Sequence, residues 1–220
     1  TSGSTGTPKP RQVEKKRMEA SARLTCSFLG LKEGDSALLC MPLQYIAGKM
    51  VVVRSLVAGL KLIPVAPSGH PLKDLKEAPT FAAMIPMQVF NTLQVSEEKD
   101  KLKKIKHLII GGGAIDEALA NDLKSFPNHV WSTYGMTETL SHIALRAANG
   151  PHRSEFYTPL PEVSLSLTDT GTLQITAPYL GIHQLTTNDL AEVSPDGRFR
   201  ILGRADAVIN SGGVKIQAED

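Results

Sequence analysis

The periodicity of the apolar residues changes near Gly150, and this change restricts the folds open to the 220-residue chain. Before that point, short apolar runs such as 37–41 alternate with longer mixed segments such as 46–58. This alternation is typical of a layered α/β sheet with parallel strand pairs. After it, short apolar segments flank turn sequences at 168–171 and 195–197, which predict antiparallel hairpins. The expected fold class is α/β, a layered sheet-and-helix body followed by a small β-barrel-like subdomain.

The same change sets the expected domain boundaries. We place the α/β part at 1–150, the small β subdomain at 151–203, and a hinge with the start of a truncated C-terminal domain at 204–220. The chain opens within a Gly/Ser/Thr-rich loop that follows no strand, and it stops partway through an alternating run after Val214. We therefore expect this sequence to be the central part of a longer protein.

Composition and charge exclude several classes of function. Hydrophobic residues make up 41% and charged residues 21%, which excludes collagen-like and disordered chains. The net charge of +2 gives no argument for binding nucleic acid or an anionic membrane, and the apolar runs are far too short for a membrane span. Cys26 and Cys40 are too few for a disulfide scaffold and lack metal-ligand spacing. We expect buried thiols in a reducing compartment, the cytoplasm, and a small molecule as the partner.

The opening segment has the composition of a phosphate-binding loop. Its glycines let backbone N–H groups turn toward one point, its hydroxyls add donors, and its lysine supplies a positive charge. Such a loop can wrap the β- and γ-phosphates of a nucleotide, although it lacks the Gly-Lys-Ser/Thr of a P-loop GTPase. On composition alone, a flexible linker is the alternative. The candidate residues are Thr1, Ser2, Gly3, Ser4, Thr5, Gly6, Thr7 and Lys9.

Four segments, in order, resemble those of the adenylate-forming enzymes, the family of acyl-CoA synthetases, peptide-synthetase adenylation domains and luciferases. They are TSGSTGTPK at 1–9, YGMTET at 134–139, TTND at 186–189 and GRADAVINSGG at 203–213. In addition, GGGA at 111–114 falls where the family has its adenine-contacting loop. The resemblance implies an α/β body, a small β-barrel, and a hinge to a mobile C-terminal domain, whose catalytic lysine lies past the end of this sequence.

The resemblance gives the YGMTET segment the phosphate and metal chemistry. It assigns the α-phosphate to Thr137 and Mg²⁺ to Glu138, with Gly135 and Met136 in the same nucleotide-binding segment. Mg²⁺ is a hard cation that takes few carboxylates together with phosphate oxygens, which suits a single glutamate. The alternative is a helix N-terminus capped by Thr137, and both hold if the helix start is itself the anion site. Thr137, Glu138 and Lys9 are the catalytic candidates.

The resemblance also implies a nucleoside site and a hinge. The nucleoside residues are Gly111, Gly112, Gly113 and Ala114 for adenine, Tyr134 stacked on it, and Asp189 and Arg204 for the ribose hydroxyls. An ionised carboxylate only accepts hydrogen bonds, so Asp189 suits two hydroxyls. Asp206 matches the hinge. The alternatives are a tight turn at the glycines, a core aromatic, loop aspartates and a surface arginine.

Three positions depart from the family pattern. Asn188 and Pro10 stand where glycine is usual, and Tyr45 stands where histidine is usual. We expect an altered backbone beside Asp189 and a stiffer exit from the opening loop.

The implied activity is that of an acid–thiol ligase that uses ATP, Mg²⁺ and coenzyme A. A carboxylate attacks the α-phosphorus, pyrophosphate leaves, and the coenzyme A thiol then attacks the acyl-adenylate. Two alternatives stay open, a nucleotide-binding fragment without turnover and a synthetase for a fatty or aryl acid. We expect the sequence by itself to be nearly inactive, because it lacks the catalytic lysine.

The segments 38–63, 108–119 and 132–145 most resemble those of the o-succinylbenzoate–CoA ligases of menaquinone biosynthesis. That acid is a compact dianion with a keto group, so its pocket should be short and polar. The candidate pocket residues are Tyr45, Lys49, Ser132, Ser141 and His142. Taken singly, a solvated lysine, a serine that ends a helix and a packed histidine are the alternatives.

Overall fold

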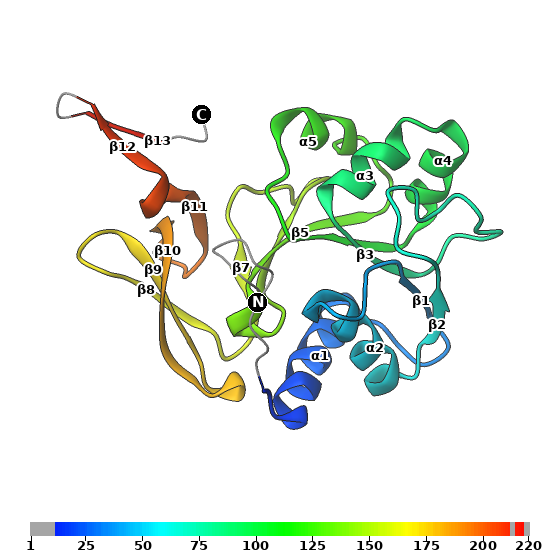
Figure 1. The fold of residues 1–220 in the computed structure, drawn as a ribbon, viewed down its shortest axis with the longest axis horizontal. Coiled ribbons are helices and arrows are strands. Elements are labelled where there is room, and N and C mark those ends of the chain that lie inside the picture. Colours follow the sequence, from blue (N-terminus) through cyan, green and yellow to red (C-terminus); the bar gives the residue numbers. More distant parts are fainter. Residues whose placement is uncertain (1–11, 212–213, 218–220) are drawn as a thin grey trace.

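The computed structural model describes residues 12–211 and 214–217, and an α/β body lies beside a smaller all-β part (Figure 1). The elements, in chain order, are α1 Lys15–Leu29, β1 Ser36–Leu39, α2 Ile46–Ala58, β2 Lys61–Pro64, β3 Phe81–Met84, α3 Pro86–Leu93, α4 Ser96–Lys104, β4 His107–Ile110, α5 Glu117–Leu123, β5 His129–Gly135, η1 Thr137–Thr139, β6 His142–Ala147, β7 Thr158–Pro159, β8 Ser164–Leu167, β9 Thr172–Ala177, η2 Pro178–Leu180, β10 Ile182–Val193, β11 Phe199–Arg204, η3 Ala205–Ala207, β12 Val208–Ser211 and β13 Val214–Gln217.

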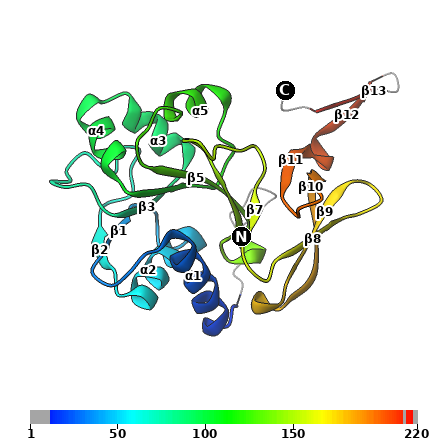
Figure 2. The ribbon, with the colours of Figure 1, turned by 180° about the vertical axis from the view of Figure 1, so that it is seen from behind.

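The large sheet of the described chain has seven strands in the order β2-β1-β3-β4-β5-β6-β7. β1 to β5 pair in parallel, and β6 and β7 pair antiparallel at one edge. Side chains alternate between its faces: Leu38 packs with α3, α4 and α5, whereas Ala37 and Leu39 pack with α1 and α2. Helices therefore cover both faces (Figure 2), as expected for parallel strands that are buried on both sides.

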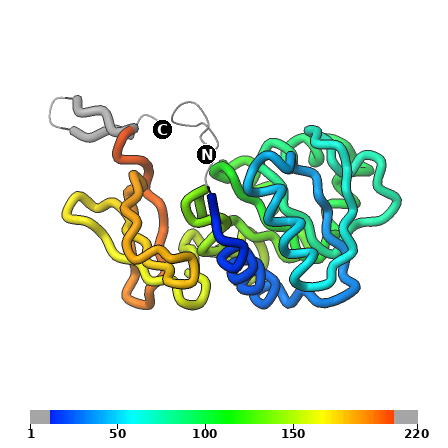
Figure 3. The backbone as a smooth tube through the Cα atoms, turned by 60° about the horizontal axis from the view of Figure 1, so that its bottom comes forward, coloured from blue at the N-terminus to red at the C-terminus, as the bar shows by residue number. Residues whose placement is uncertain are grey.

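The smaller part is an antiparallel sheet in the order β11-β10-β9-β8. The turns 168–171 and 195–197 connect β8 to β9 and β10 to β11, so both hairpin predictions are confirmed. Phe199 and Ile175 of this sheet share a buried core with Ile143 of β6. The small sheet also lies beside α1 (Figure 3), where an Arg17 guanidinium nitrogen donates to the carbonyl of Leu180 at 2.8 Å.

Two expectations about the strands were incomplete. β6 and β7 were not predicted, and the strand that precedes the turn at 195–197 is the twelve-residue β10, longer than the short segment expected there. The first half of β10 exposes polar residues such as Gln184 and Thr186, so an apolar pattern does not mark it as a strand. In the ranges that the structure describes, the helices are too short or too polar to cross a bilayer.

A buried histidine links stability to pH. His107 is 8% exposed, and its ring stacks on that of His129 with the centroids 5.4 Å apart. Its ring nitrogens have no hydrogen-bond partner among the described residues. Burial, together with the charges of Lys106 and His129, lowers the pKa of His107 to about 4. The unfolded chain then binds a proton that the folded chain does not, so the free energy of unfolding falls as the pH drops from about 6.5 toward 4.

We expect His107→Leu to remove up to about 1.4 kcal/mol per pH unit from this slope. The measurement is urea unfolding of the intact protein from about pH 4.5 to about pH 7.5. This range covers most of the interval between the folded and the unfolded pKa of His107. Burial also lowers the pKa of His142, followed by the charge of Arg54. That residue is present in both proteins, so the difference between their curves reports His107 alone. Curves of the same slope would contradict the prediction.

Candidate active site

Two of the candidate segments, the glycine loop at 111–114 and η1, follow the ends of parallel strands of the large sheet. β4 ends at Ile110, directly before the glycine loop, and β5 ends at Gly135, shortly before η1. In open α/β sheets, ligands bind outside the carboxyl ends of the strands. The opening loop at 1–9 and Pro10 lie outside the described residues.

The glycine loop exposes its backbone at this edge. Gly111 is partly buried, whereas Gly112, Gly113 and Ala114 are exposed. A Cβ on Gly111 would collide with the hydroxyl of Thr133, and Gly112 has a φ of +79°, which favours glycine. The loop therefore presents bare backbone where a flat base can approach, and its contact with adenine stays a prediction.

η1 is a single 3₁₀ turn. Thr137 is its first residue, so the alternative in which Thr137 caps a helix is wrong. The Thr139 hydroxyl accepts from the Met136 N–H at 2.9 Å and lies 2.7 Å from the carbonyl of Ser141, to which it donates. These bonds fix the turn from inside, while Thr137 and Glu138 stay partly exposed beside the end of β5.

Asp189 joins the large sheet to the small one. It lies on β10 directly opposite Arg204 of β11, and an Arg204 Nη1 to Asp189 Oδ1 distance of 3.6 Å marks an ion pair. The Tyr134 hydroxyl, from β5, donates to Asp189 Oδ2 at 2.6 Å. The structure thus brings together three residues that the sequence assigned to one nucleoside site.

The hinge candidate Asp206 is held by the same arginine. Arg204 donates from Nε and Nη2 to the two carboxylate oxygens of Asp206, at 2.8 and 2.7 Å. Asn188 Nδ2 lies 3.5 Å from the same carboxylate. The hydrogen bond from Arg204 is the main cause that lowers the pKa of Asp206. Asp206 is exposed, as a solvated loop aspartate would be, but its carboxylate is paired with Arg204.

Of the candidate pocket residues, Tyr45 and Lys49 lie together at the start of α2, where the Lys49 N–H donates to the Tyr45 carbonyl at 3.3 Å, whereas Ser132 lies on β5. Tyr45 precedes α2 and Lys49 lies in its first turn, and both are exposed. Ser132 is buried, and its hydroxyl shares a 2.9 Å hydrogen bond with the hydroxyl of Tyr157. The Ser132 hydroxyl thus already has a hydrogen-bond partner within the protein. The roles of Tyr45, Lys49 and Ser132 in an acyl pocket stay predictions.

Ser141 and His142 contact side chains of the helices α1 and α2. His142 is buried, and its Nε2 lies 3.0 Å from the hydroxyl of Thr25 on α1. The Ser141 hydroxyl accepts a hydrogen bond from Nη2 of Arg54 on α2. We call Thr25, Arg54, Ser141 and His142 the buried polar cluster.

Sequence reasoning missed Arg54. Its side chain is 2% exposed, and its Nε has no partner among the described residues. No carboxylate in the described ranges pairs with it, and burial lowers its pKa to about 10, so it stays charged at neutral pH. Burying a cation without a counter-ion is costly. The signal was an arginine inside the apolar segment VVVRSLV of α2.

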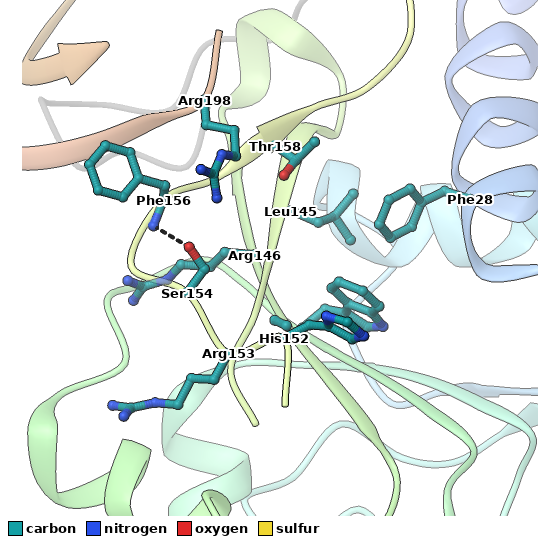
Figure 4. Close-up of a pocket in the computed structure, with 11 residues that line it drawn as sticks. Phe28, Leu145, Arg146, His152, Arg153, Ser154, Phe156, Thr158 and Arg198 are labelled. Atoms are coloured by element: carbon teal, nitrogen blue, oxygen red, sulfur yellow. Dashed lines mark hydrogen bonds between the residues drawn. The ribbon is translucent and has the colours of Figure 1, made fainter. Parts of the chain in front are cut away.

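A groove of about 530 Å³ opens at the other end of β5. Figure 4 shows Phe28 and Leu145 together at one end of it, and Arg198 beside Phe156 at the other. Trp131, near the start of β5, also lines the groove. None of the described candidate residues lines it, so we place the candidate site at the carboxyl end of the strands.

Comparison with protein families identifies the chain. Residues 1–179 match the family of AMP-binding enzymes. The chain belongs to the AMP-binding enzyme family. This confirms the resemblance, and the matched residues include the glycine loop and η1. Asp189, Arg204 and Asp206 lie beyond the matched range.

Two curated relatives and one solved structure extend this result. The 2-succinylbenzoate–CoA ligase of Escherichia coli (strain K12) is 27% identical over 234 residues, covering 100% of this chain and 50% of that ligase. The enzyme of the same name from Enterococcus faecalis (strain ATCC 700802 / V583) is 34% identical over 148 residues, or 65% of this chain and 30% of that enzyme. The acyl-CoA synthetase (AMP-forming)/AMP-acid ligase II-like protein from Dyadobacter fermentans DSM 18053 has a TM-score of 0.88 and 40% identity, covering 99% of this chain and 62% of that one.

The chain thus spans half the length of the first relative and less of the second. The solved structure covers the small sheet as well as the α/β body. The predicted fold class, a layered α/β body with a curled antiparallel sheet of an AMP-binding enzyme, is therefore confirmed.

Proposed function

We propose that the protein is an ATP-dependent acid–CoA ligase whose acid is o-succinylbenzoate, also called 2-succinylbenzoate. The observation that carries this proposal is the meeting of Tyr134, Asp189 and Arg204, from three strands, in a chain of the AMP-binding family. The names of the two curated relatives support the choice of acid.

In this proposal the nucleotide lies across the ends of β4 and β5. Adenine contacts the exposed backbone at 111–114, and the ribose hydroxyls donate to Asp189, with Arg204 beside it. Thr137 binds the α-phosphate, and the opening loop with Lys9 binds the outer phosphates. The chain's own part in the chemistry is to position the reacting groups and to offset their charge.

Glu138 fits a Mg²⁺ ion that is shared with the nucleotide. The described residues contain no group of three or more histidine, cysteine or acidic side chains that would form a metal site by themselves. Mg²⁺ in nucleotide enzymes takes one or two carboxylates together with phosphate oxygens and water, so a single glutamate suits it. When bound, the ion neutralises charge on the phosphates.

The reaction runs in two steps in this proposal. The acid's carboxylate oxygen attacks the α-phosphorus and pyrophosphate leaves, and the coenzyme A thiol then displaces AMP from the acyl-adenylate. We propose Asp206 as the hinge between these steps, with 1–150 as the nucleotide- and acyl-binding part, 151–203 as the small β subdomain and 204–220 as the hinge region. Cys26 and Cys40 are free and buried, which supports a reducing compartment such as the cytoplasm.

The buried polar cluster supports a dianionic acid. o-Succinylbenzoate carries a second carboxylate besides the one that is activated, and Arg54 offers a guanidinium that lacks a carboxylate partner among the described residues. A guanidinium can bind a carboxylate through two parallel hydrogen bonds. Ser141, which already contacts Arg54, can donate to the keto group or to the same carboxylate.

The test is coenzyme A thioester formation by the intact protein with ATP and Mg²⁺. We expect a clear preference for o-succinylbenzoate over benzoate and over medium- and long-chain fatty acids. A preference for a fatty acid would refute the choice of acid and leave the adenylation chemistry in place. The lack of acid-dependent ATP–pyrophosphate exchange with every acid would instead favour a nucleotide-binding protein without turnover.

A further inference from the structure

We propose that Tyr134 is a positioning residue, whose hydroxyl holds the Asp189 carboxylate in the orientation that receives the ribose hydroxyls. The proposal rests on the proposed function, because it takes Asp189 as the ribose ligand. It gives Tyr134 a task that is separate from any stacking of its ring on adenine.

The bond itself is short and comes from a distant part of the chain. The Tyr134 hydroxyl donates to Asp189 Oδ2 at 2.6 Å, and Arg204 Nη1 lies 3.6 Å from Oδ1. A carboxylate has about four acceptor directions, so these two contacts leave room for two ribose hydroxyls. Each oxygen is thus held on one side and stays available on the other.

Asp189 pairs with Arg204 of β11, but the strand on either side of it is irregular. The pairing of β10 with β9 is irregular between Thr186 and Leu190, and its pairing with β11 shifts between Leu190 and Ala191. The local support is a hydrogen bond from the Asp189 N–H to the Thr187 hydroxyl at 3.1 Å. The Tyr134 hydroxyl adds a second contact, made to the carboxylate itself.

The Tyr134 ring can supply this contact because the ring is itself fixed. It meets Phe199 edge-on with the centroids 5.1 Å apart, and it lies 6.0 Å from the ring of Tyr157. Tyr157 stacks on Phe199 at 5.4 Å and shares its hydroxyl hydrogen bond with Ser132. A donor on a packed ring fixes its acceptor before the ligand arrives, which lowers the entropic cost of binding.

The electrostatics keep this donor protonated. Burial raises the pKa of Tyr134 far above its usual value, and the nearby Asp189 carboxylate raises it further. The phenol is therefore protonated at neutral pH and can donate to Asp189. A hydrogen bond to an ionised acceptor is stronger than one between neutral groups.

The test compares Tyr134→Phe with the wild type, as the intact protein, in direct calorimetric binding of AMP, 2′-deoxy-AMP and 3′-deoxy-AMP. Phenylalanine keeps the ring packing and loses only the donor. We expect the Kd for AMP to rise about tenfold, and the penalty for removing either ribose hydroxyl to shrink by a similar factor. In turnover, the KM for ATP should rise while kcat changes by about twofold or less.

Tyr157→Phe is the matched control, because it removes a hydroxyl from the same aromatic group without removing a donor to Asp189. It should keep the wild-type discrimination between AMP and its deoxy analogues. A second measurement uses Asp189→Ala, which removes the acceptor of the Tyr134 hydroxyl, so that the further change Tyr134→Phe should have little added effect on AMP binding.

The outcomes separate the two proposals. Wild-type discrimination in Tyr134→Phe, or fully additive effects in the double variant, would overturn the positioning role and leave the proposed function intact. A wild-type protein that binds no AMP would overturn the proposed function and this inference with it. Reduced discrimination in Tyr134→Phe but not in Tyr157→Phe would establish the role.

Discussion

Glu138→Ala is expected to abolish acid-dependent ATP–pyrophosphate exchange by the intact protein, with a loss of about 1,000-fold or more. The proposed task of Glu138 is to hold Mg²⁺ against the phosphates while pyrophosphate leaves. The turn that carries it is fixed from inside by Thr139. Alanine therefore removes the carboxylate and keeps the two Thr139 hydrogen bonds of η1.

Two comparisons make this result specific. Glu138→Gln keeps the size of the side chain and loses its charge, so it should be nearly as inactive. Glu97→Ala removes an exposed carboxylate on α4 that pairs with Lys101 and should leave exchange unchanged. Exchange in Glu138→Ala within about threefold of the wild type would contradict the metal role, given the several kcal/mol such an ion supplies.

The second large effect concerns Arg54. We expect Arg54→Met to raise the KM for o-succinylbenzoate about 100-fold, because the second carboxylate loses its cationic partner. Benzoate has no second carboxylate, so its poor turnover should change little. Steady-state kinetics with both acids measure the difference. Arg54→Lys should recover only part of the loss, because an ammonium lacks the paired geometry of a guanidinium.

The thermal stability of Arg54→Met should not fall together with its activity. Replacing a buried charge that lacks a carboxylate partner by an apolar side chain of similar length is neutral or stabilising. We therefore expect the melting temperature of Arg54→Met without substrate to equal or exceed that of the wild type. A variant that melts earlier and loses activity equally with both acids would point to a structural arginine instead.

The sequence predicted the regular elements well where the local signals agreed. α2 matches the mixed segment 46–58, because Gly59 ends its apolar run. β6 was missed because its residues HIALRA come directly after the YGMTET segment, and no turn sequence between the two marks the start of a strand. β10 was cut short because its polar first half is exposed.

The candidate site was only partly predictable for a similar reason. The resemblance placed Tyr134, Asp189 and Arg204 in one nucleoside site, and the structure brings them together. The bond between Tyr134 and Asp189 joins residues that are 55 positions apart and depends on how the two sheets pack, which no local pattern encodes. Arg54 was missed because an isolated arginine on a helix is normally solvated.

The buried polar cluster and the pair formed by Tyr134 and Asp189 draw on different secondary-structure elements. This difference has a consequence for the evolution of such a protein. The buried polar cluster takes Thr25 and Arg54 from α1 and α2, whereas the bond between Tyr134 and Asp189 joins β5 to β10. Under the proposed function, substitutions at Thr25 and Arg54 should alter the preferred acid while the bond between Tyr134 and Asp189 is kept. Directed evolution toward other acids should therefore begin on α1 and α2.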